Sequence, residues 1–208
     1  MAGDLAAVAA ELAVPLTVAQ RDKLERYLAL LSQWNAVYNL TALRDPADMF
    51  SHHLADCLAV VPPLCREKPS GRVLDVGSGG GLPGVVLAIE NTGWQVTCVD
   101  AVGKKAAFVR QVAGSLQLPN LQALHARIES LREPPFDLVV SRAFSSLADF
   151  TALTRPLLAS GGVWAAMKGK EPADEVAALP ADITVFHVEP VVVPGLDADR
   201  CLVWMRTC

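Results

Sequence analysis

The sequence lacks any apolar run near the roughly 20 residues that a membrane-spanning helix needs. Charged residues, glycine or proline interrupt each of its short apolar runs, although its mean hydropathy is +0.32. It also lacks the pattern of a secretory signal, because Asp4 and Glu11 stand where a basic segment and an apolar core are required. We therefore expect a cytoplasmic protein that makes no membrane contact.

Cysteine is scarce, and its number and spacing fit neither a disulfide framework nor a zinc site. The five cysteines are an odd number, and no two of them form a C-x-x-C pair. This argues against a disulfide framework or a zinc site and favours a reducing compartment. The adjacent His52 and His53 have no carboxylates at ligand spacing, so no metal site is expected. A chain of 208 residues is long enough for one well-buried domain with a small appendage.

The net charge of −4 at first discourages a nucleic-acid partner. Charge is distributed unevenly, however: residues 71–170 carry ten basic and seven acidic side chains, whereas residues 171–208 carry two and seven. A local basic face can bind a polyanion on a chain that is acidic overall. Composition alone favours the simpler interpretation, a solvated surface of mixed sign.

The first part of the chain, residues 4–63, has a helical pattern. One apolar stripe recurs at three- and four-residue spacing, formed by Leu24, Tyr27, Leu28, Leu31, Trp34 and Tyr38. Asp45 before Pro46 is typical of a helix start, and Pro62-Pro63 predicts the end of that helix. Residues 68–71 mark a seam, so we expect a helical cap at 1–70 and a core at 71–208 that form one structural unit.

From residue 72 onward, short β-branched runs alternate with helical stretches, which predicts an α/β fold with a mostly parallel sheet covered on both faces. The expected strands are 72–76, 94–100, 121–126, 136–141 and 163–167, and the expected helices are 83–90, 104–118, 147–158 and 173–179. Two last strands, 183–193 and 202–206, follow each other without a helix. They predict an antiparallel hairpin and complete a Rossmann-like, seven-stranded sheet.

A glycine-rich turn follows the first strand and precedes a helix, which is the arrangement of a nucleotide-type site. It contains Gly77, Gly79, Gly81 and Gly84. The last three match the dinucleotide fingerprint, and Asp100 lies 21 residues after Gly79, where a carboxylate would bind ribose hydroxyls. An NAD-dependent oxidoreductase is therefore one hypothesis.

Three features favour S-adenosylmethionine (SAM) instead. Asp75, two residues before Gly77, suits the methionine ammonium of SAM and would repel a pyrophosphate. The predicted hairpin departs from a dehydrogenase core, and the helix, Gly-Gly turn and strand at 157–163 are usual before the fifth strand of SAM-dependent methyltransferases. Ile128, after the third strand, would border the adenine in such a fold, or it is simply a core residue.

Together these motifs resemble the glucose-inhibited division protein B family, the bacterial small-subunit ribosomal RNA (guanine-N7) methyltransferases. The resemblance covers about residues 18–205. Its specific segments are 34–41, Arg44-Asp45-Pro46, His53-Leu54-Ala55-Asp56, 75–84, Asp100 with Lys104-Lys105, Phe136-Asp137, Ser141-Arg142-Ala143 and Lys168-Gly169. Two positions depart from the usual pattern: Cys57 replaces a common serine, and Gly80 replaces a frequent proline. Neither departure removes a charge or a ligand.

The resemblance implies SAM-dependent methylation of N7 of a guanine in a conserved loop of 16S rRNA, on naked RNA or in the small ribosomal subunit. It also implies SAM contacts by Gly77, Leu82, Ile128, Glu129 and Arg142. Guanine N7 has a free lone pair and no proton, so in-line transfer requires no general base. The absence of an obvious base in the sequence agrees with that chemistry.

Arg142 follows the fourth strand, where we expect it to place the SAM carboxylate or the target nucleotide. Lys168 is the second residue expected to position the reactants. Candidates for RNA phosphate contacts are Lys104, Lys105, Arg110, Lys168 and Lys170. Asn39, Thr41, His53 and Asp56 of the helical cap could contact RNA, or they could equally form a hydrogen-bond network that joins the cap to the core. We expect a monomer, with a small-molecule methyltransferase as the second hypothesis and the oxidoreductase as the third.

Overall fold

The computed structural model describes residues 4–208, so residues 1–3 of the expected cap lie outside the described residues. Its centre is a seven-stranded sheet in the order β3-β2-β1-β4-β5-β7-β6. The strands are β1 (Gly71–Val76), β2 (Trp94–Asp100), β3 (Leu121–His125), β4 (Phe136–Ser141), β5 (Leu158–Lys168), β6 (Ile183–Pro190) and β7 (Cys201–Thr207). The first five strands pair in parallel, and β7 is antiparallel to both β5 and β6. The predicted fold class is confirmed.

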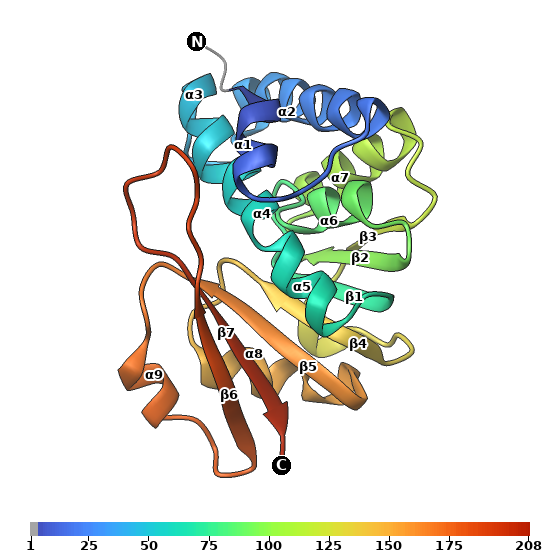
Figure 1. Ribbon diagram of the computed structural model, residues 1–208. Helices are drawn as coiled ribbons and strands as arrows, with labels where there is room; N and C mark the ends of the chain where they lie inside the picture. Colours follow the sequence, from blue (N-terminus) through green and yellow to red (C-terminus); the bar gives the residue numbers. More distant parts are fainter. Residues whose placement is uncertain (1–3) are drawn as a thin grey trace.

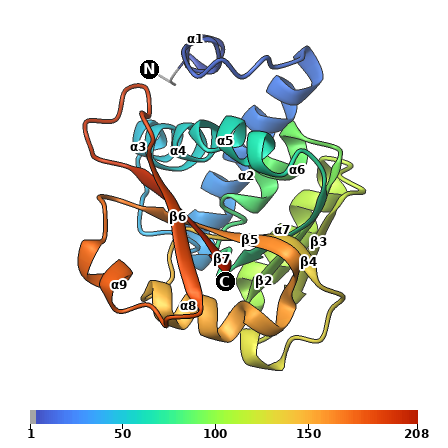
Figure 2. The same ribbon diagram turned by 60° about the horizontal axis from the view of Figure 1, so that its bottom comes forward.

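Helices cover both faces of this sheet (Figures 1 and 2). One face packs against α6 (Gly84–Glu90), α7 (Gly103–Ser115) and the helical cap, and the other packs against α8 (Leu147–Thr154). Side chains alternate between the two layers because neighbouring strand residues point to opposite faces. Val73 belongs to the first cluster and Leu74 to the second. Burial on both faces explains the nearly continuous apolar runs of these strands.

The cap consists of α1 (Leu5–Glu11), α2 (Val18–Tyr38), α3 (Pro46–Met49), the π-helical turn η1 (Phe50–Ala55), α4 (Asp56–Ala59) and α5 (Val61–Glu67). A capping box between Thr17 and Gln20 begins α2. Asp45 begins α3 as predicted, accepting hydrogen bonds from two backbone amides, with Pro46 in the first turn. The predicted stripe of α2 is buried at Leu24, Tyr27 and Leu31, whereas Tyr38 at its end is 44% exposed.

The prediction that Pro62-Pro63 stops a helix was wrong. Both prolines lie in the first turn of α5, which continues to Glu67. The reason is that the first helical turn needs no intrahelical N–H donors, so proline is tolerated there. The chain turns briefly at Val60 and then resumes the helical path.

The start of the fifth strand was also predicted wrongly. The helix expected over 147–158 ends at Thr154 and is followed by a 3₁₀ turn, Arg155–Leu157, and β5 then begins at Leu158. The Gly161-Gly162 pair therefore lies inside the strand. The register of the pairing between β4 and β5 shifts at this point. Phe136 lies opposite Leu158, but Leu138, only two residues later, lies opposite Val163. Gly161 has φ +72°, which lets the extra residues bulge out of the ladder.

Other boundaries differ by smaller amounts. The helix expected at 104–118 is α7, ending at Ser115, and the one expected at 173–179 is α9 (Ala173–Ala177). The strand expected over 183–193 ends at Pro190, where the β6–β7 loop begins. This loop rises beside the cap in Figure 1, and its Val193 packs against Ala55 and Ala59.

In the part of the chain that the structure describes, no helix is long and apolar enough to cross a membrane.

Candidate functional site

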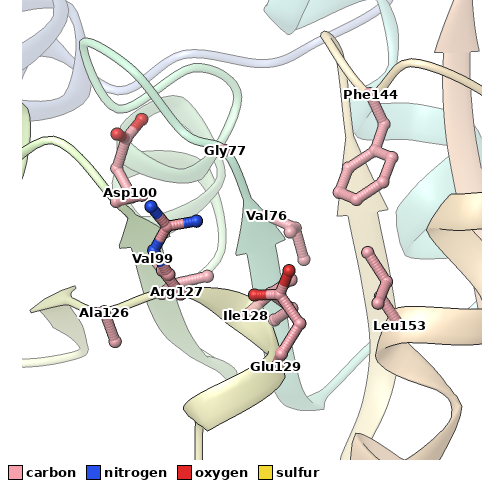
Figure 3. A pocket seen from close by; sticks show the side chains of 11 residues that line it. Val76, Gly77, Val99, Asp100, Ala126, Arg127, Ile128, Glu129, Phe144 and Leu153 are labelled. Carbon is pink, nitrogen blue, oxygen red and sulfur yellow. The ribbon is translucent and has the colours of Figure 1, made fainter.

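A pocket of about 220 Å³ lies where β1, β2 and β3 end, beside the loop that follows β4. Ligands of open α/β sheets bind at the carboxyl ends of the strands, at the point where strand order reverses. Here that point lies between β1 and β4, and Ser141 Oγ donates a 2.9 Å hydrogen bond to the Val76 carbonyl across it. The pocket is lined by Val76, Gly77, Val99, Asp100, Ala101, Ala126, Arg127, Ile128, Glu129, Phe144 and Leu153 (Figure 3).

The glycine turn forms the pocket's floor at Gly77, which has φ +67°. A Cβ atom at Gly77 would meet nothing within 4 Å, so the space above this residue is open to a ligand. Gly84 has a different role: a Cβ there would collide with Cys98 Sγ and would come within 2.8 Å of Asp75 Oδ2. Glycine is therefore required at one position by the backbone conformation and at the other by close packing.

Asp75 lies beneath the turn and is fully buried. Its Oδ2 accepts a 2.8 Å hydrogen bond from the Gly84 amide, whereas its Oδ1 has no hydrogen-bond partner among residues 4–208. Burial raises the pKa of the Asp75 carboxyl to about 7, against the lowering effects of the Gly84 hydrogen bond and the Arg142 charge. An unpartnered buried carboxylate oxygen is costly, so it indicates a missing cationic or donor partner.

Asp100 ends β2 and touches the pocket while anchoring two loops. One oxygen accepts a hydrogen bond from the Gly79 amide at 2.9 Å, and the other accepts one from the Val102 amide at 2.8 Å. The carboxylate is thereby held at the pocket wall with only 7% of the residue exposed. Ribose binding by Asp100 stays a prediction, and the geometry leaves lone pairs free for it.

The far end of the pocket is apolar. Figure 3 shows Phe144 and Leu153 on one side, facing the side on which Ile128 and Glu129 follow β3. Phe144 also packs on Phe150 of α8, with ring centroids 5.5 Å apart. A flat aromatic ligand could be held between these two walls. Sequence reasoning found Ile128 and Glu129 but missed Phe144 and Leu153, which no local pattern marks as pocket residues.

Four of the predicted cofactor residues line the pocket, namely Gly77, Asp100, Ile128 and Glu129. The others do not. Gly79 is tied to Asp100, and Leu82 is buried in the turn, with its amide donating to the Ser78 carbonyl at 2.9 Å. Arg142 points toward the cap, where its Nη1 donates to the His52 carbonyl at 2.9 Å and lies 3.5 Å from Asp56 Oδ2.

His53 and Asp56 contact Arg142 of the core, so they form the predicted link between cap and core, and Thr41 contacts His53. Asn39 instead accepts a 3.0 Å hydrogen bond from Arg44 within the cap. His53 Nε2 lies 2.8 Å from Thr41 Oγ1, and its Nδ1 lies 3.2 Å from Arg142 Nη1. Burial first, and then the Arg142 charge, lowers the pKa of His53 to about 4. The ring is therefore neutral near pH 7. Among residues 4–208, no three His, Cys, Asp or Glu side chains are arranged to hold a metal ion.

The candidate RNA-binding cations form two separate groups. Lys104, Lys105 and Arg110 lie on α7, beside β2 and β3, and Arg110 Nη1 also donates to the Ala123 carbonyl at 3.3 Å. Lys168 is the last residue of β5 and Lys170 follows it, on the other side of the strand reversal. Lys168 is not free, because its Nζ lies 2.8 Å from Glu175 Oε2. The two groups thus flank the pocket edge of the sheet.

Comparison with known proteins gives a consistent result. The profile of the family described as GidB, rRNA small subunit methyltransferase G, matches residues 20–203. A ribosomal RNA small subunit methyltransferase G from Acidovorax sp. (strain JS42) is 58% identical over an alignment of 205 positions. The alignment covers 94% of this chain and 90% of that protein.

Solved structures show the same fold. A SAM-dependent methyltransferase from Aquifex aeolicus has a TM-score of 0.60 at 18% identity, covering 80% of this chain and 96% of that one. The 1,6-didemethyltoxoflavin-N1-methyltransferase of Burkholderia thailandensis, with bound S-adenosylhomocysteine (SAH), has a TM-score of 0.59 at 16% identity, covering 93% and 92%.

Proposed function

Because the chain belongs to the rRNA small subunit methyltransferase G family, we propose that it transfers the methyl group of SAM to N7 of a guanine in 16S rRNA. The observation that carries this proposal is the pocket at the strand reversal. It gathers Gly77, Asp100 and Ile128 in a chain that matches the family over nearly its whole length. The partner is therefore ribosomal RNA, naked or assembled in the small subunit.

The residues present fit SAM. Open space above Gly77 suits the close approach of a ligand to the backbone, and the orphaned Asp75 Oδ1 suits an ammonium group. Asp100 would accept the ribose hydroxyls, while Ile128, Glu129, Phe144 and Leu153 would enclose the adenine. Leu82 and Gly79 would shape the turn, and Arg142 would meet the methionine carboxylate. When bound, SAM supplies an electrophilic methyl group on a sulfonium.

The chain's own task is to orient the two reactants. Guanine N7 carries a lone pair and no proton, so no side chain needs to accept one. Holding both reactants in line can supply much of the rate enhancement. Arg142, just after β4, and Lys168, at the end of β5, would position them. The residues that would contact RNA phosphates are Lys104, Lys105, Arg110, Lys168 and Lys170.

Several broader properties complete the proposal. Residues 1–70 and 71–208 would form one folding unit, because a single apolar cluster contains Leu24 of the cap together with Val140 and Trp204 of the core.

The protein would act as a monomer, since its exposed large apolar residues are scattered over separate segments. Its compartment would be the cytoplasm, where ribosomal RNA is modified and where unpaired thiols persist.

The direct test is methyl transfer from labelled SAM to small-subunit rRNA and to small ribosomal subunits, both taken from a strain that lacks this gene. Nucleoside analysis should find the label in 7-methylguanosine. Absence of label from both substrates, with SAM binding intact, would overturn the proposal in favour of a small-molecule methyltransferase. Thermal protection by SAH but not by NADH should separately exclude the oxidoreductase, because a ligand stabilises the fold that it binds.

A further inference from the structure

We propose that Asp56 and His53 of the cap are positioning residues, which hold the Arg142 guanidinium in place for the methionine carboxylate of SAM. The inference rests on the proposed function in one respect, namely that SAM is the ligand of the site. Neither cap residue lines the pocket, and Arg142 itself lies outside the pocket lining with Nη1 turned to the cap, so the cap residues would act by fixing where that guanidinium stands when SAM binds.

Arg142 is held from the cap rather than from its own strand. It follows β4 directly, yet its Nη1 contacts the His52 carbonyl at 2.9 Å, His53 Nδ1 at 3.2 Å and Asp56 Oδ2 at 3.5 Å. About three quarters of its side chain is shielded from solvent. Its charge also lowers the pKa of Asp75, after the larger effects of burial and the Gly84 hydrogen bond. The guanidinium is thus fixed by three contacts from one segment of the cap.

His53 links the cap to Arg142 through both of its ring nitrogens. Its Nδ1 lies 3.2 Å from Arg142 Nη1 and 3.1 Å from the His52 carbonyl, and its Nε2 lies 2.8 Å from Thr41 Oγ1. The lowered pKa, about 4, keeps the ring neutral, so it adds no positive charge beside the guanidinium. Thr41, His53 and Arg142 therefore form a continuous set of polar contacts from the cap to the loop after β4.

Asp56 supplies the negative charge of this arrangement. Its side chain is 5% exposed, and its Oδ1 accepts a 2.9 Å hydrogen bond from Arg200 Nε in the β6–β7 loop. One buried carboxylate therefore faces two guanidinium groups, from Arg142 and Arg200. A buried carboxylate with excellent partners fixes geometry, and removing it would leave both cations without compensation.

The π-helical turn explains how the cap presents these residues. His53 and Asp56 are three residues apart, so they share one face of the helical path that runs from η1 into α4. Turns with the wider π-helical pattern occur frequently at functional sites. The same path has its other side packed in the core through Leu54 and Cys57. The face that bears His53 and Asp56 is thereby directed toward Arg142.

A fixed guanidinium should bind a carboxylate better than a mobile one. An arginine that is already held loses little rotamer freedom on binding, which improves affinity through preorganisation. The consequence is specific: loss of Asp56 or of the Thr41–His53 bond should weaken SAH binding only while Arg142 is present.

The test is a double-mutant cycle on SAH affinity, measured by calorimetry with Asp56→Asn, Arg142→Gln and the combined variant. We expect Arg142→Gln to weaken binding by about 10- to 100-fold and Asp56→Asn by about tenfold, the range of a charged hydrogen bond. The combined variant should bind no more weakly than Arg142→Gln alone. Unchanged affinity in Asp56→Asn, or losses that multiply, would overturn the proposal.

Two further variants keep the test decisive. Asp22→Asn removes a carboxylate that pairs with Arg26 on the exposed face of α2, so it is a matched control whose SAH affinity should stay unchanged. If Asp56→Asn does not fold, Thr41→Val is the milder substitute. It should weaken SAH binding by about two- to fivefold, as a neutral hydrogen bond would, and equal affinity to the unsubstituted protein would contradict the proposal.

Failure of the positioning role differs from failure of the proposed function. SAH binding requires no RNA, so the cycle can show coupling even if ribosomal RNA is not methylated. Coupling without rRNA methylation would support the positioning role of Asp56 and contradict the assignment of rRNA as substrate. Normal rRNA methylation, with the affinity losses of Asp56→Asn and Arg142→Gln simply adding in free energy, would support rRNA as substrate and contradict the positioning role.

Discussion

The Gly79 amide donates a 2.9 Å hydrogen bond to Asp100 Oδ2, which ties the glycine turn after β1 to the end of β2. Asp100 therefore shapes the pocket in addition to lining it. Because its other oxygen holds the Val102 amide, the start of α7 depends on the same carboxylate.

Asp100→Ala should lose both affinity and stability. Each lost bond to a charged acceptor is worth about 1.5–3 kcal/mol, so unfolding should occur at clearly lower urea concentration and SAH should bind at least tenfold more weakly. Asp45→Ala is the matched control, because Asp45 also accepts two backbone amides but lies in the cap. It should lose stability without losing SAH affinity. A similar affinity in both variants would remove Asp100 from the ligand site.

Gly77→Asp should abolish SAH binding while the protein still folds. The Cβ of the new side chain would meet nothing within 4 Å, and its carboxylate would enter the pocket that Gly77 lines, where its charge would oppose Asp100. Gly195→Asp is the control, since Gly195 has φ +75° and equally open surroundings in the β6–β7 loop. Both variants should lose about 1–2 kcal/mol of stability through the left-handed conformation. Calorimetric SAH affinity that survives in Gly77→Asp would show that the turn does not bind the cofactor.

SAH binding should strengthen as pH rises from about 5.5 toward 7, with release of a proton. The Asp75 carboxyl has its pKa raised to about 7 by burial, and an ammonium ligand pairs with the ionised form. The ligand's amino group stays protonated over this range because an α-amino group has a pKa of about 8. Calorimetry in buffers of different ionisation enthalpy measures the proton, and Asp75→Asn should abolish both the release and the pH dependence.

The raised pKa of Asp75 also affects the stability of the free protein, which should fall with pH over the range in which SAH binding strengthens. Between pH 3.8 and about 7 the folded protein keeps a proton on Asp75 that the unfolded chain has lost, so stability falls as pH rises through this interval. Glu90 contributes similarly, because burial raises its pKa to about 7 as well. Glu90→Gln is therefore the control: it should reduce the pH slope of unfolding but leave the pH dependence of SAH binding intact. Loss of that dependence in Glu90→Gln would contradict the role of Asp75.

Lys168→Ala should weaken RNA binding more than SAH binding. Removal of one phosphate contact should reduce the slope of log affinity against log salt by about 0.7–0.9, which titration at several salt concentrations measures. Lys23→Ala, on α2 beside Gln117, is the control and should keep the slope. Equal losses for RNA and SAH would instead place Lys168 in the cofactor pocket.

Local patterns in the sequence predicted what is locally encoded. The alternation of strands and helices predicted the parallel sheet, and the absence of a helix after residue 183 predicted the antiparallel hairpin, because side-chain period and turn residues decide these features within a few positions. The spacing of Asp75, Gly77 and Asp100 predicted a nucleotide-type site for the same reason. These residues lie at the ends of adjacent strands, and parallel pairing brings such ends together.

The tertiary structure decided everything that depends on contacts between distant segments. Arg142 contacts the carbonyl of His52, 90 residues earlier, and Asp56 meets Arg200, 144 residues later. No periodicity or motif encodes such distances. Phe144 and Leu153 became pocket walls only because α8 packs against the 3₁₀ turn Ile128–Ser130 that follows β3. The helical path continues through Pro62-Pro63 because the first turn of α5 needs no backbone donors. The sequence by itself determined the elements and the glycine turn, and packing alone determined which side chains face one another.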